Sequence, residues 1–317
     1  MEEEQVSDHR CWDELLPDTL GIIFCKLSLQ ELLTVVPRVC KSWEKVVNGP
    51  YCWREIDIEE WCNGSTPENI DRMVRMLLTR SCGSLRKLYV SELHGDPIFS
   101  FIADNASSLQ MLRLSRSDIT DDVIEREAEK FSNITSLDLS YCCKLGARAL
   151  EAMGKKCRLL SSLTRNMHPY YTESKEILSQ DEEAWAIAST MQKLKQLEIA
   201  YLLVETEGVM EIIHKCRDLE LLDVRGCWDV RIEHKEIEDK FPNLKILGPH
   251  VHYWNKTHWE YMMSDCSNSL YDSDDMLFDY EDDDDDEQLE LRFYDGSDGD
   301  FGYGWPLDHD RGWPASP

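Results

Sequence analysis

A short apolar pattern that recurs through the middle of the chain constrains the fold more than any other feature. The pattern is apolar-x-x-apolar-x-apolar. Its copies are LRKLYV from Leu85, LQMLRL from Leu109, ITSLDL from Ile134, LSSLTR from Leu160, LKQLEI from Leu194, LELLDV from Leu219 and a shortened LKILG from Leu244. Successive copies start 24, 25, 26, 34, 25 and 25 residues apart. A near-constant period of this length indicates a stack of repeated units, and it predicts about seven repeats within residues 67–249.

A second register supports the first one. Three residues before each copy stands an apolar residue: Cys82, Ala106, Phe131, Cys157, Met191, Cys216 or Phe241. The segments between copies, such as LGARALEAMGKKC from Leu145, carry apolar residues at helical spacing. Each unit is therefore predicted to contain a strand, a loop and a helix, which resembles the leucine-rich repeat. That resemblance implies an α/β fold, a short solenoid arc of parallel strands, with Asn or Cys at the ninth position of a repeat.

The adjacent cysteines Cys142 and Cys143 admit four interpretations: half of a metal site, part of a disulfide framework, a reactive pair, or the filling of a packed turn. Twelve cysteines are scattered through the chain, and no two of them have the C-x-x-C spacing that zinc sites and redox motifs use. Cys142 and Cys227 both stand at the ninth position of a repeat. We therefore predict that Cys142 is a buried structural residue and that the chain uses no metal or other cofactor.

The charge of the chain is strongly negative and unevenly distributed. The formal net charge is −28, and residues 265–317 hold 18 Asp and Glu residues against Arg292 and Arg311, a net charge of −16. Phosphate binding needs clustered Lys and Arg, so direct nucleic-acid binding is not expected. Residues 250–317 form an acidic tail interrupted by aromatic residues. This composition predicts a largely disordered segment, with docking to a basic partner as the alternative.

The chain shows no sign of export or of membrane insertion. Its beginning, MEEEQVSDHR, is acidic where a secretory signal needs positive charge followed by an apolar run. No stretch approaches the roughly 18 apolar residues of a membrane span. We therefore expect an intracellular protein with reduced thiols, located in the nucleus, the cytoplasm or both, without membrane contact.

Residues 12–58 carry the clearest indication of function. Pro17 begins a predicted helix, Ser28 and Glu31 form a capping box for a second helix, and Pro37 separates that helix from a third one that ends near Val47. About 40 residues is a marginal size for an independent core. The helices carry more apolar side chains than such a unit can cover, so part of their apolar surface is expected to bind a partner.

The motifs of this segment resemble those of the F-box family. They are the opening Leu16-Pro17, IFCKL from Ile23, ELL from Glu31, VCKSW from Val39 and WREID from Trp53. An F-box followed directly by leucine-rich repeats is similar to a plant subfamily of substrate receptors in Skp, cullin and F-box (SCF) ubiquitin ligases. The resemblance implies an acidic N-terminal segment (1–11), a three-helix F-box (12–58), leucine-rich repeats (67–249) and the acidic tail (250–317).

The same resemblance implies a function and a set of partners. A Skp-type adaptor should bind the box and connect it indirectly to a cullin, while the repeats hold an unknown protein substrate for ubiquitination. No catalytic residue is then needed in this chain. The adaptor-binding residues implied are Leu16, Pro17, Ile23, Leu27, Leu32, Val36, Val39 and Trp43. Some of them, Trp43 above all, could instead hold the box together.

The period of the strands predicts the substrate face. Fourth and sixth positions of each repeat should point inward, which leaves the third, fifth and seventh positions for the open face. An insertion after the fourth copy, RNMHPYYTESKEILSQ from Arg165, adds aromatic residues. The substrate-binding residues predicted are Tyr89, Arg113, Asp138, Glu198, Asp223 and Arg225 on the sheet, with Arg165, Tyr170 and Tyr171 in the insertion. Because the face becomes acidic toward its C-terminal half, it suits a basic protein segment.

Three other functions remain alternatives on sequence alone. The chain could be an interaction scaffold, or an inhibitor that binds a basic partner through the repeats or the tail, outside any ligase. An enzyme is a weaker alternative because the sequence shows no nucleophile or acid-base pair. A small-molecule sensor is weaker as well, because seven repeats form only a short arc.

Overall fold

The computed structural model describes residues 12, 15–168 and 179–249. Its central feature is an eight-stranded sheet in which each strand pairs in parallel with the next one along the chain. The strands are β1 (Glu55–Asp57), β2 (Lys87–Ser91), β3 (Met111–Ser115), β4 (Ser136–Asp138), β5 (Ser162–Thr164), β6 (Gln196–Glu198), β7 (Leu221–Asp223) and β8 (Lys245–Leu247). The predicted leucine-rich-repeat solenoid is confirmed.

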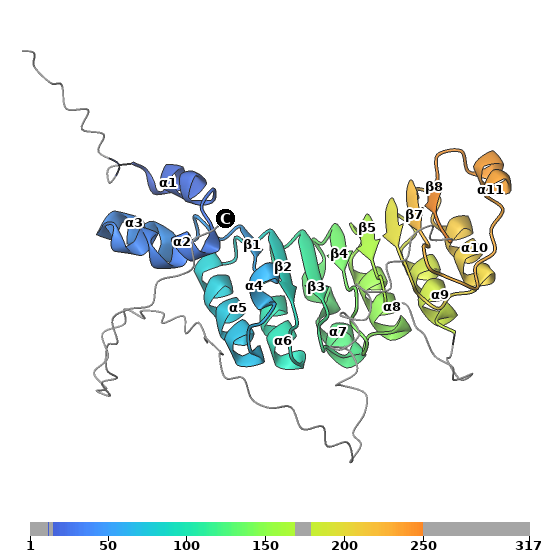
Figure 1. Cartoon of the computed structure of the whole chain (residues 1–317), viewed down its shortest axis with the longest axis horizontal. Coiled ribbons are helices and arrows are strands. Elements are labelled where there is room, and N and C mark those ends of the chain that lie inside the picture. Colours follow the sequence, from blue (N-terminus) through green and yellow to red (C-terminus); the bar gives the residue numbers. More distant parts are fainter. Residues whose placement is uncertain (1–11, 13–14, 169–178, 250–317) are drawn as a thin grey trace, which may run out of the picture. The chain divides into compact units, whose positions relative to one another are not determined.

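Helices connect successive strands, and those from α5 to α10 lie in a row along one face of the sheet, as Figure 1 shows. They are α4 (Glu59–Cys62), α5 (Pro67–Ser81), α6 (Asp96–Asp104), α7 (Asp121–Glu127), α8 (Ala147–Lys156), α9 (Asp181–Thr190), α10 (Thr206–Lys215) and α11 (His234–Lys240), with a 3-10 turn η3 (Ala128–Phe131) after α7. None of the described helices is long and apolar enough to cross a lipid bilayer.

The core follows the predicted register of the repeats. Fourth-position leucines lie opposite one another on neighbouring strands and are fully buried: Leu88, Leu112, Leu137, Leu163, Leu197 and Leu222. Residues of the second register, such as Phe131 and Cys157, are buried at the ends of the helices. Because each unit buries its apolar face against the next unit, the helices and the sheet share one continuous core.

The seventh copy departs from the predicted alignment. Lys245, Ile246 and Leu247 lie opposite Leu221, Leu222 and Asp223. The copy that begins at Leu244 therefore lacks one residue ahead of its fourth position. Ile246 occupies the position that holds a buried leucine in the other copies. The fifth position of this copy is consequently Leu247 and not Gly248.

The sheet begins earlier than the repeat pattern indicated. Strand β1 belongs to the WREID motif, and its Ile56 lies opposite Leu88 of β2. The sequence segment assigned to the box therefore supplies the first strand of the solenoid, so the two regions share residues. This strand escaped the repeat pattern because it precedes the first complete copy.

The short connection from β1 to α5 is held against the sheet. The Glu59 carboxylate of α4 accepts hydrogen bonds from Ser115 Oγ at 2.6 Å and from Arg113 Nη1 at 3.1 Å. Asn63 Oδ1 accepts one from Arg116 Nη2 at 2.8 Å. Thr66 then caps α5. These contacts fix the connection between the box and the repeats rather than leaving it as a free linker.

The ninth-position cysteines fill the turns that leave the strands. Cys142 Sγ donates a hydrogen bond to the carbonyl oxygen of Leu114 at 2.9 Å, and Cys227 Sγ donates one to Ile199 at 3.2 Å. Both acceptors stand at the sixth position of the preceding repeat. Both cysteines are fully buried, whereas Cys143 is exposed. The structural interpretation of Cys142 is confirmed.

A labelling experiment should separate the two adjacent thiols. Burial raises the pKa of Cys142 to about 12, so at pH 8 only on the order of one molecule in ten thousand carries the reactive thiolate. Brief treatment of the native chain with iodoacetamide should modify Cys143 and spare Cys142, as read by peptide mass spectrometry. Unfolding in urea should make both thiols reactive. Comparable labelling of both thiols in the native chain would show that the turn is open.

Candidate adaptor-binding and substrate-binding surfaces

The box consists of the predicted short helices. They are α1 (Pro17–Phe24), α2 (Leu29–Thr34) and α3 (Lys41–Asn48), with a 3-10 turn η2 (Val36–Arg38) before α3. Pro17 occupies the first turn of α1. The capping box of α2 is complete, because Ser28 Oγ accepts a hydrogen bond from the Glu31 amide and the Glu31 carboxylate accepts one from the Ser28 amide. Local sequence signals therefore fix the beginnings of the first two helices.

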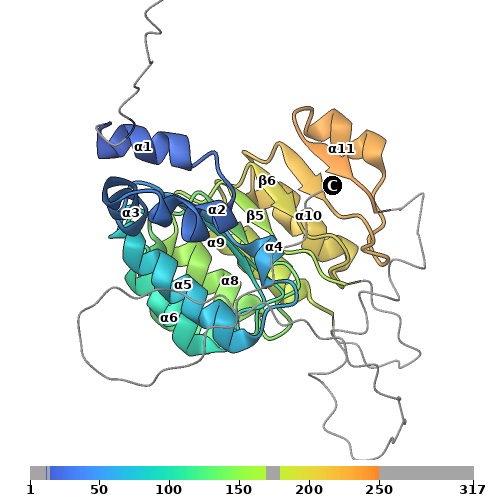
Figure 2. The same cartoon turned by 60° about the vertical axis from the view of Figure 1, so that its left-hand side comes forward.

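A small apolar core holds these helices together. Leu20 and Phe24 of α1 are buried with Val46 and Val47 of α3, and α1 lies beside α3 in Figure 2. The Phe24 ring packs edge-on against Trp43, with the ring centroids 5.0 Å apart. The buried Trp53 donates a hydrogen bond from Nε1 to the Val47 carbonyl oxygen at 2.6 Å. Trp53 therefore ties α3 to the segment that leads into β1.

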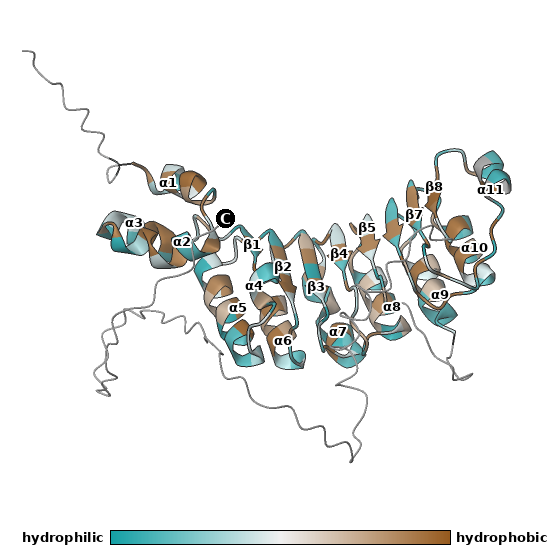
Figure 3. Cartoon of the chain, viewed as in Figure 1, coloured by the Kyte–Doolittle hydropathy of each residue, from teal (hydrophilic) through white to brown (hydrophobic). Residues whose placement is uncertain are grey.

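The box leaves large apolar side chains in solvent. Among the described residues, ten large hydrophobic side chains are exposed, and seven of these lie within residues 12–39: Trp12, Leu16, Ile22, Ile23, Leu27, Val35 and Val39. The exposed fraction reaches 71% for Leu16 and 69% for Ile22. Figure 3 shows the hydrophobic colour on α1 and α2. Such a concentration of exposed apolar side chains is typical of a protein-binding surface.

The structure divides the predicted adaptor-binding residues into two groups. Leu16, Pro17, Ile23, Leu27 and Val39 are exposed, as contact with a partner requires. The prediction is wrong for Leu32 and Val36, which are buried to 6% and 2% exposure in the core of the box. Trp43 is half-buried against Phe24.

Sequence reasoning also omitted two exposed residues of the same surface. Ile22 lies on the exposed side of α1, and Val35 follows α2. Adjacent apolar residues gave no periodic signal to separate Ile22 from Ile23, or Val35 from Val36. Only the packing of the three helices distinguishes them.

Arg113 organises the open face of the first strands. Tyr89, Arg113 and Asp138 lie side by side at the fifth positions of β2, β3 and β4. The guanidinium of Arg113 lies 5.1 Å from the ring centroid of Tyr89 and pairs through Nε with Asp138 Oδ2 at 3.1 Å. Its Nη1 reaches Glu59 of α4. The structure therefore brings these three predicted residues together with Glu59, which sequence reasoning missed.

The C-terminal half of the face is less acidic than predicted. Arg225 pairs with Asp223, so that the Asp223 carboxylate is neutralised and only 2% exposed. The prediction of Asp223 as a contact residue is wrong, because burial under Arg225 removes it from the surface. Arg225 itself is exposed. Glu198 is half-buried and accepts a long hydrogen bond from Asn166 Nδ2 at 3.5 Å.

Arg165 is a structural residue, and its prediction as a contact residue is wrong. The side chain is 1% exposed and pairs with the buried Glu183 of α9 at 3.0 Å. Its guanidinium also donates hydrogen bonds to the carbonyl oxygens of Leu139, Cys142 and Leu145, at 3.2, 3.2 and 2.7 Å. Through these hydrogen bonds Arg165 stabilises the turn that follows β4. The predicted contact residues Tyr170 and Tyr171 lie outside the described residues, as does the acidic tail.

Four of the seventh positions that were expected on the open face are buried, whereas Arg225 at the same position of its repeat is exposed. Ser91, Ser115, Ser140 and Ala200 are each less than 8% exposed. The Ser115 hydroxyl lies under α4, where it meets Glu59. Small residues stand here because the chain turns immediately after each strand, and that turn covers them.

The side chains at the eighth positions of the repeats were not included in the predicted set of substrate-binding residues. Glu92, Arg116, Tyr141 and Tyr201 adopt positive φ angles of 58°, 52°, 62° and 61°, which turn the chain at the end of the strand. Tyr141 stacks on the neighbouring His168 ring at 4.3 Å, and burial raises the pKa of Tyr141. Gly226 continues this row with φ of 75°, and any side chain at this position would overlap the Tyr201 ring. We call Glu92, Arg116, Tyr141 and Tyr201 the eighth-position row.

Within the described residues, no group of three or more His, Cys, Asp or Glu side chains has the arrangement of a metal site. The hydrogen bonds and ion pairs of the open face connect charged and aromatic side chains with one another. The open face therefore presents charged and aromatic groups to solvent.

Comparisons with known proteins agree with the geometry of the box. The family described as F-box-like matches residues 13–59. The chain is 52% identical over 277 residues to F-box protein FBW2 of Arabidopsis thaliana, covering 86% of each chain. It is 32% identical to F-box protein SKIP1 of the same plant, over 77% of this chain and 87% of the relative, and 31% identical to F-box protein SKIP19, over 77% and 78%. With its box and its repeats, this chain belongs to the plant F-box and leucine-rich-repeat proteins.

Proposed function

We propose that this chain is the substrate-recognition subunit of an SCF-type ubiquitin ligase, in which the box binds a Skp-type adaptor and the repeats bind a protein substrate. F-box proteins are in general non-catalytic adaptors of such complexes. The observation that carries the proposal is the concentration of exposed apolar side chains on α1 and α2, inside the segment that matches the family. A cullin then joins through the adaptor without contacting this chain.

The fixed connection between box and repeats suits this role. Glu59 and Asn63 are bonded to residues of β3 and of the turn after it, and β1 is part of the sheet. A substrate held on the repeats therefore keeps a defined position relative to the adaptor. Transfer of ubiquitin to a lysine depends on such positioning, because the reacting groups must be brought together.

The open face of the sheet is the proposed substrate surface. It combines the Arg113 cluster at the fifth positions with the eighth-position row, and it therefore presents charged groups together with Tyr89, Tyr141 and Tyr201. Aromatic and arginine side chains contribute strongly to protein–protein contacts. Because most carboxylates of this face are paired with arginines, specificity should depend on the arrangement of these pairs more than on net charge.

Reconstituted ubiquitin transfer tests the proposal. The full chain is assembled with a Skp-type adaptor, a cullin and its RING subunit, and it is supplied with ubiquitin-activating and ubiquitin-conjugating enzymes and with a protein that co-purifies with it from cells. We expect ubiquitin chains on that protein, and we expect at least a tenfold lower rate when Tyr141 and Tyr201 are both changed to Ala. Binding without any transfer by the assembled ligase would favour the scaffold function instead.

A further inference from the structure

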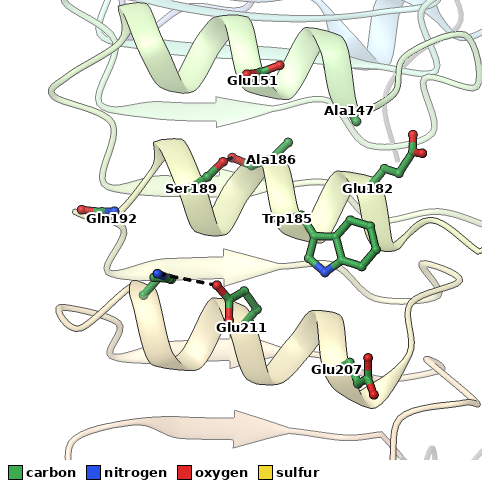
Figure 4. A pocket seen from close by; sticks show the side chains of 10 residues that line it. Ala147, Glu151, Glu182, Trp185, Ala186, Ser189, Gln192, Glu207 and Glu211 are labelled. Atoms are coloured by element: carbon green, nitrogen blue, oxygen red, sulfur yellow. Dashed lines mark hydrogen bonds and ion pairs between the residues drawn. The ribbon is translucent and has the colours of Figure 1, made fainter.

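The helical side of the repeats carries a groove across α8, α9 and α10, on elements that the proposed substrate surface does not use. Its volume is about 700 Å³. The residues that define it are Glu151 of α8, Glu182, Trp185 and Ser189 of α9, and Glu207 and Glu211 of α10, as Figure 4 shows. We call it the helical groove. Ala147 and Ala186 also line it, and such small side chains leave room between the larger ones.

Trp185 is a large apolar residue on the exposed surface of a packed helix. Its side chain is 50% exposed, and among the described residues of α4 to α11 it is the one exposed large apolar side chain. Its neighbours on α9, Ala184 and Ala186, are buried. The packing of α9 against α8 and α10 therefore does not need the indole ring. A half-exposed tryptophan presents an aromatic face that a cationic side chain can cover.

The charges around the Trp185 ring favour a positively charged ligand. Glu182 and Glu207 are exposed and, within the described part of the chain, take part in no ion pair or hydrogen bond. Figure 4 shows both on the side of the groove where the Trp185 ring lies. The other two glutamates of the groove are paired: Glu211 with Lys215, which also lines the groove, at 3.7 Å, and Glu151 with Lys155. The indole face and the free carboxylates both favour a cation.

We propose that the helical groove binds a basic segment of a partner protein, with an arginine side chain over the Trp185 ring and its guanidinium near Glu182 and Glu207. Arginine fits because a guanidinium stacks on an aromatic ring and also pairs with a carboxylate in its own plane. The acidic tail of the chain carries the wrong charge for this groove. The proposal assigns a second interaction surface, separate from the open face of the sheet and from the box.

The width of the groove sets the length of the segment. Neighbouring packed helices have axes about 8–10 Å apart, so the axes of α8 and α10 are separated by about 16–20 Å across the groove. An extended chain covers about 3.3 Å per residue, and about six residues therefore span the groove. We expect a recognised segment to carry two basic residues separated by three or four others.

A peptide probe tests this surface with the full chain and without an adaptor. The probe is a fluorescein-labelled peptide, GSRSGSRSGS, and its binding is measured by fluorescence polarisation at 100 mM salt. Trp185→Ala should weaken binding at least tenfold, whereas Trp228→Ala, which removes another exposed tryptophan, should change it less than twofold. The double variant Glu182→Gln and Glu207→Gln should weaken binding at least fivefold.

A charge-matched control distinguishes binding of the probe in the groove from general attraction of a basic peptide to an acidic chain. Glu68→Gln combined with Glu129→Gln makes the same change in net charge on α5 and η3, outside the groove, and should leave binding within twofold. The proposal would be overturned by no binding of the probe to the native chain at 1 mM, by equal losses in both double variants, or by equal affinity for a peptide with Gln in place of Arg. Equal affinity for argininamide alone would also overturn it, because the site would then take a small cation. Adaptor binding plays no part in this measurement, so its outcome is independent of the proposed ligase function.

Discussion

A chain that carries Leu16→Asp together with Ile22→Asp should lose its affinity for a Skp-type adaptor by at least a hundredfold while remaining folded. Both side chains are about 70% exposed, so an aspartate at either position stays in water in the free protein. In the complex, each carboxylate would replace an apolar contact and lose its hydration. A hundredfold loss corresponds to about 2.7 kcal/mol, which is modest for two charges placed in an apolar interface.

Isothermal titration calorimetry with the purified adaptor measures this loss, and circular dichroism confirms that the variant is folded. Leu32→Ala is the contrasting variant, because Leu32 is buried in the box and its truncation should destabilise that unit by about 2–5 kcal/mol. Lys26→Glu, at an exposed charged position between Ile23 and Leu27, reports whether charge alone matters. Near-native affinity of the folded Leu16 and Ile22 variant would place the adaptor elsewhere.

Arg165→Ala should destabilise the repeats by about 3–5 kcal/mol. Removing the guanidinium leaves the Glu183 carboxylate buried, with its remaining neutral donor Gln180, and takes a donor from three backbone carbonyl oxygens. A buried charge that has lost its partner carries an uncompensated desolvation cost. Urea unfolding followed by circular dichroism measures the difference in the free energy of unfolding. Arg158→Ala, at an exposed position just after α8, should change it by less than about 0.5 kcal/mol.

A second comparison distinguishes the ion pair from the carbonyl contacts. Replacing both Arg165 and Glu183 by Leu removes both charges and restores an apolar sixth position, as in the other repeats, where Leu139 and Ile199 stand. This double variant should recover part of the stability lost in Arg165→Ala, because no buried charge remains. It should not recover all of it, because the carbonyl oxygens of the turn after β4 still lack a donor. Full stability of Arg165→Ala would show that Arg165 does not support the turn.

The period of the repeats predicted the fold because the same local packing problem recurs in each unit. Leucines at the fourth position meet across neighbouring strands, so a pattern in the sequence becomes a column in space. The capping box of Ser28 and Glu31 was predictable for a related reason, since both partners lie within one helical turn. The one-residue shortening before Ile246 was not predictable, because apolar residues stand at both possible positions.

The functional surfaces were predicted less completely, because exposure depends on contacts between distant parts of the chain. Arg165 stands at an inward sixth position, and the pattern alone would have placed it in the core. Its partner Glu183 lies beyond the insertion, at a distance in sequence that no repeat rule specifies. Leu32 and Val36 were misassigned for the same reason, since only the packing of α1 to α3 shows which apolar side chains the box itself uses.

The measurement that tests the central claim most directly is the binding of the unmodified full chain to a purified Skp-type adaptor. Calorimetry and co-elution on a sizing column, with the fold of the chain checked by circular dichroism, give affinity and stoichiometry in one preparation. We predict a one-to-one complex with submicromolar affinity. A well-folded chain that fails to bind the adaptor at micromolar concentrations would contradict the account and would leave the exposed apolar surface of the box for a different partner.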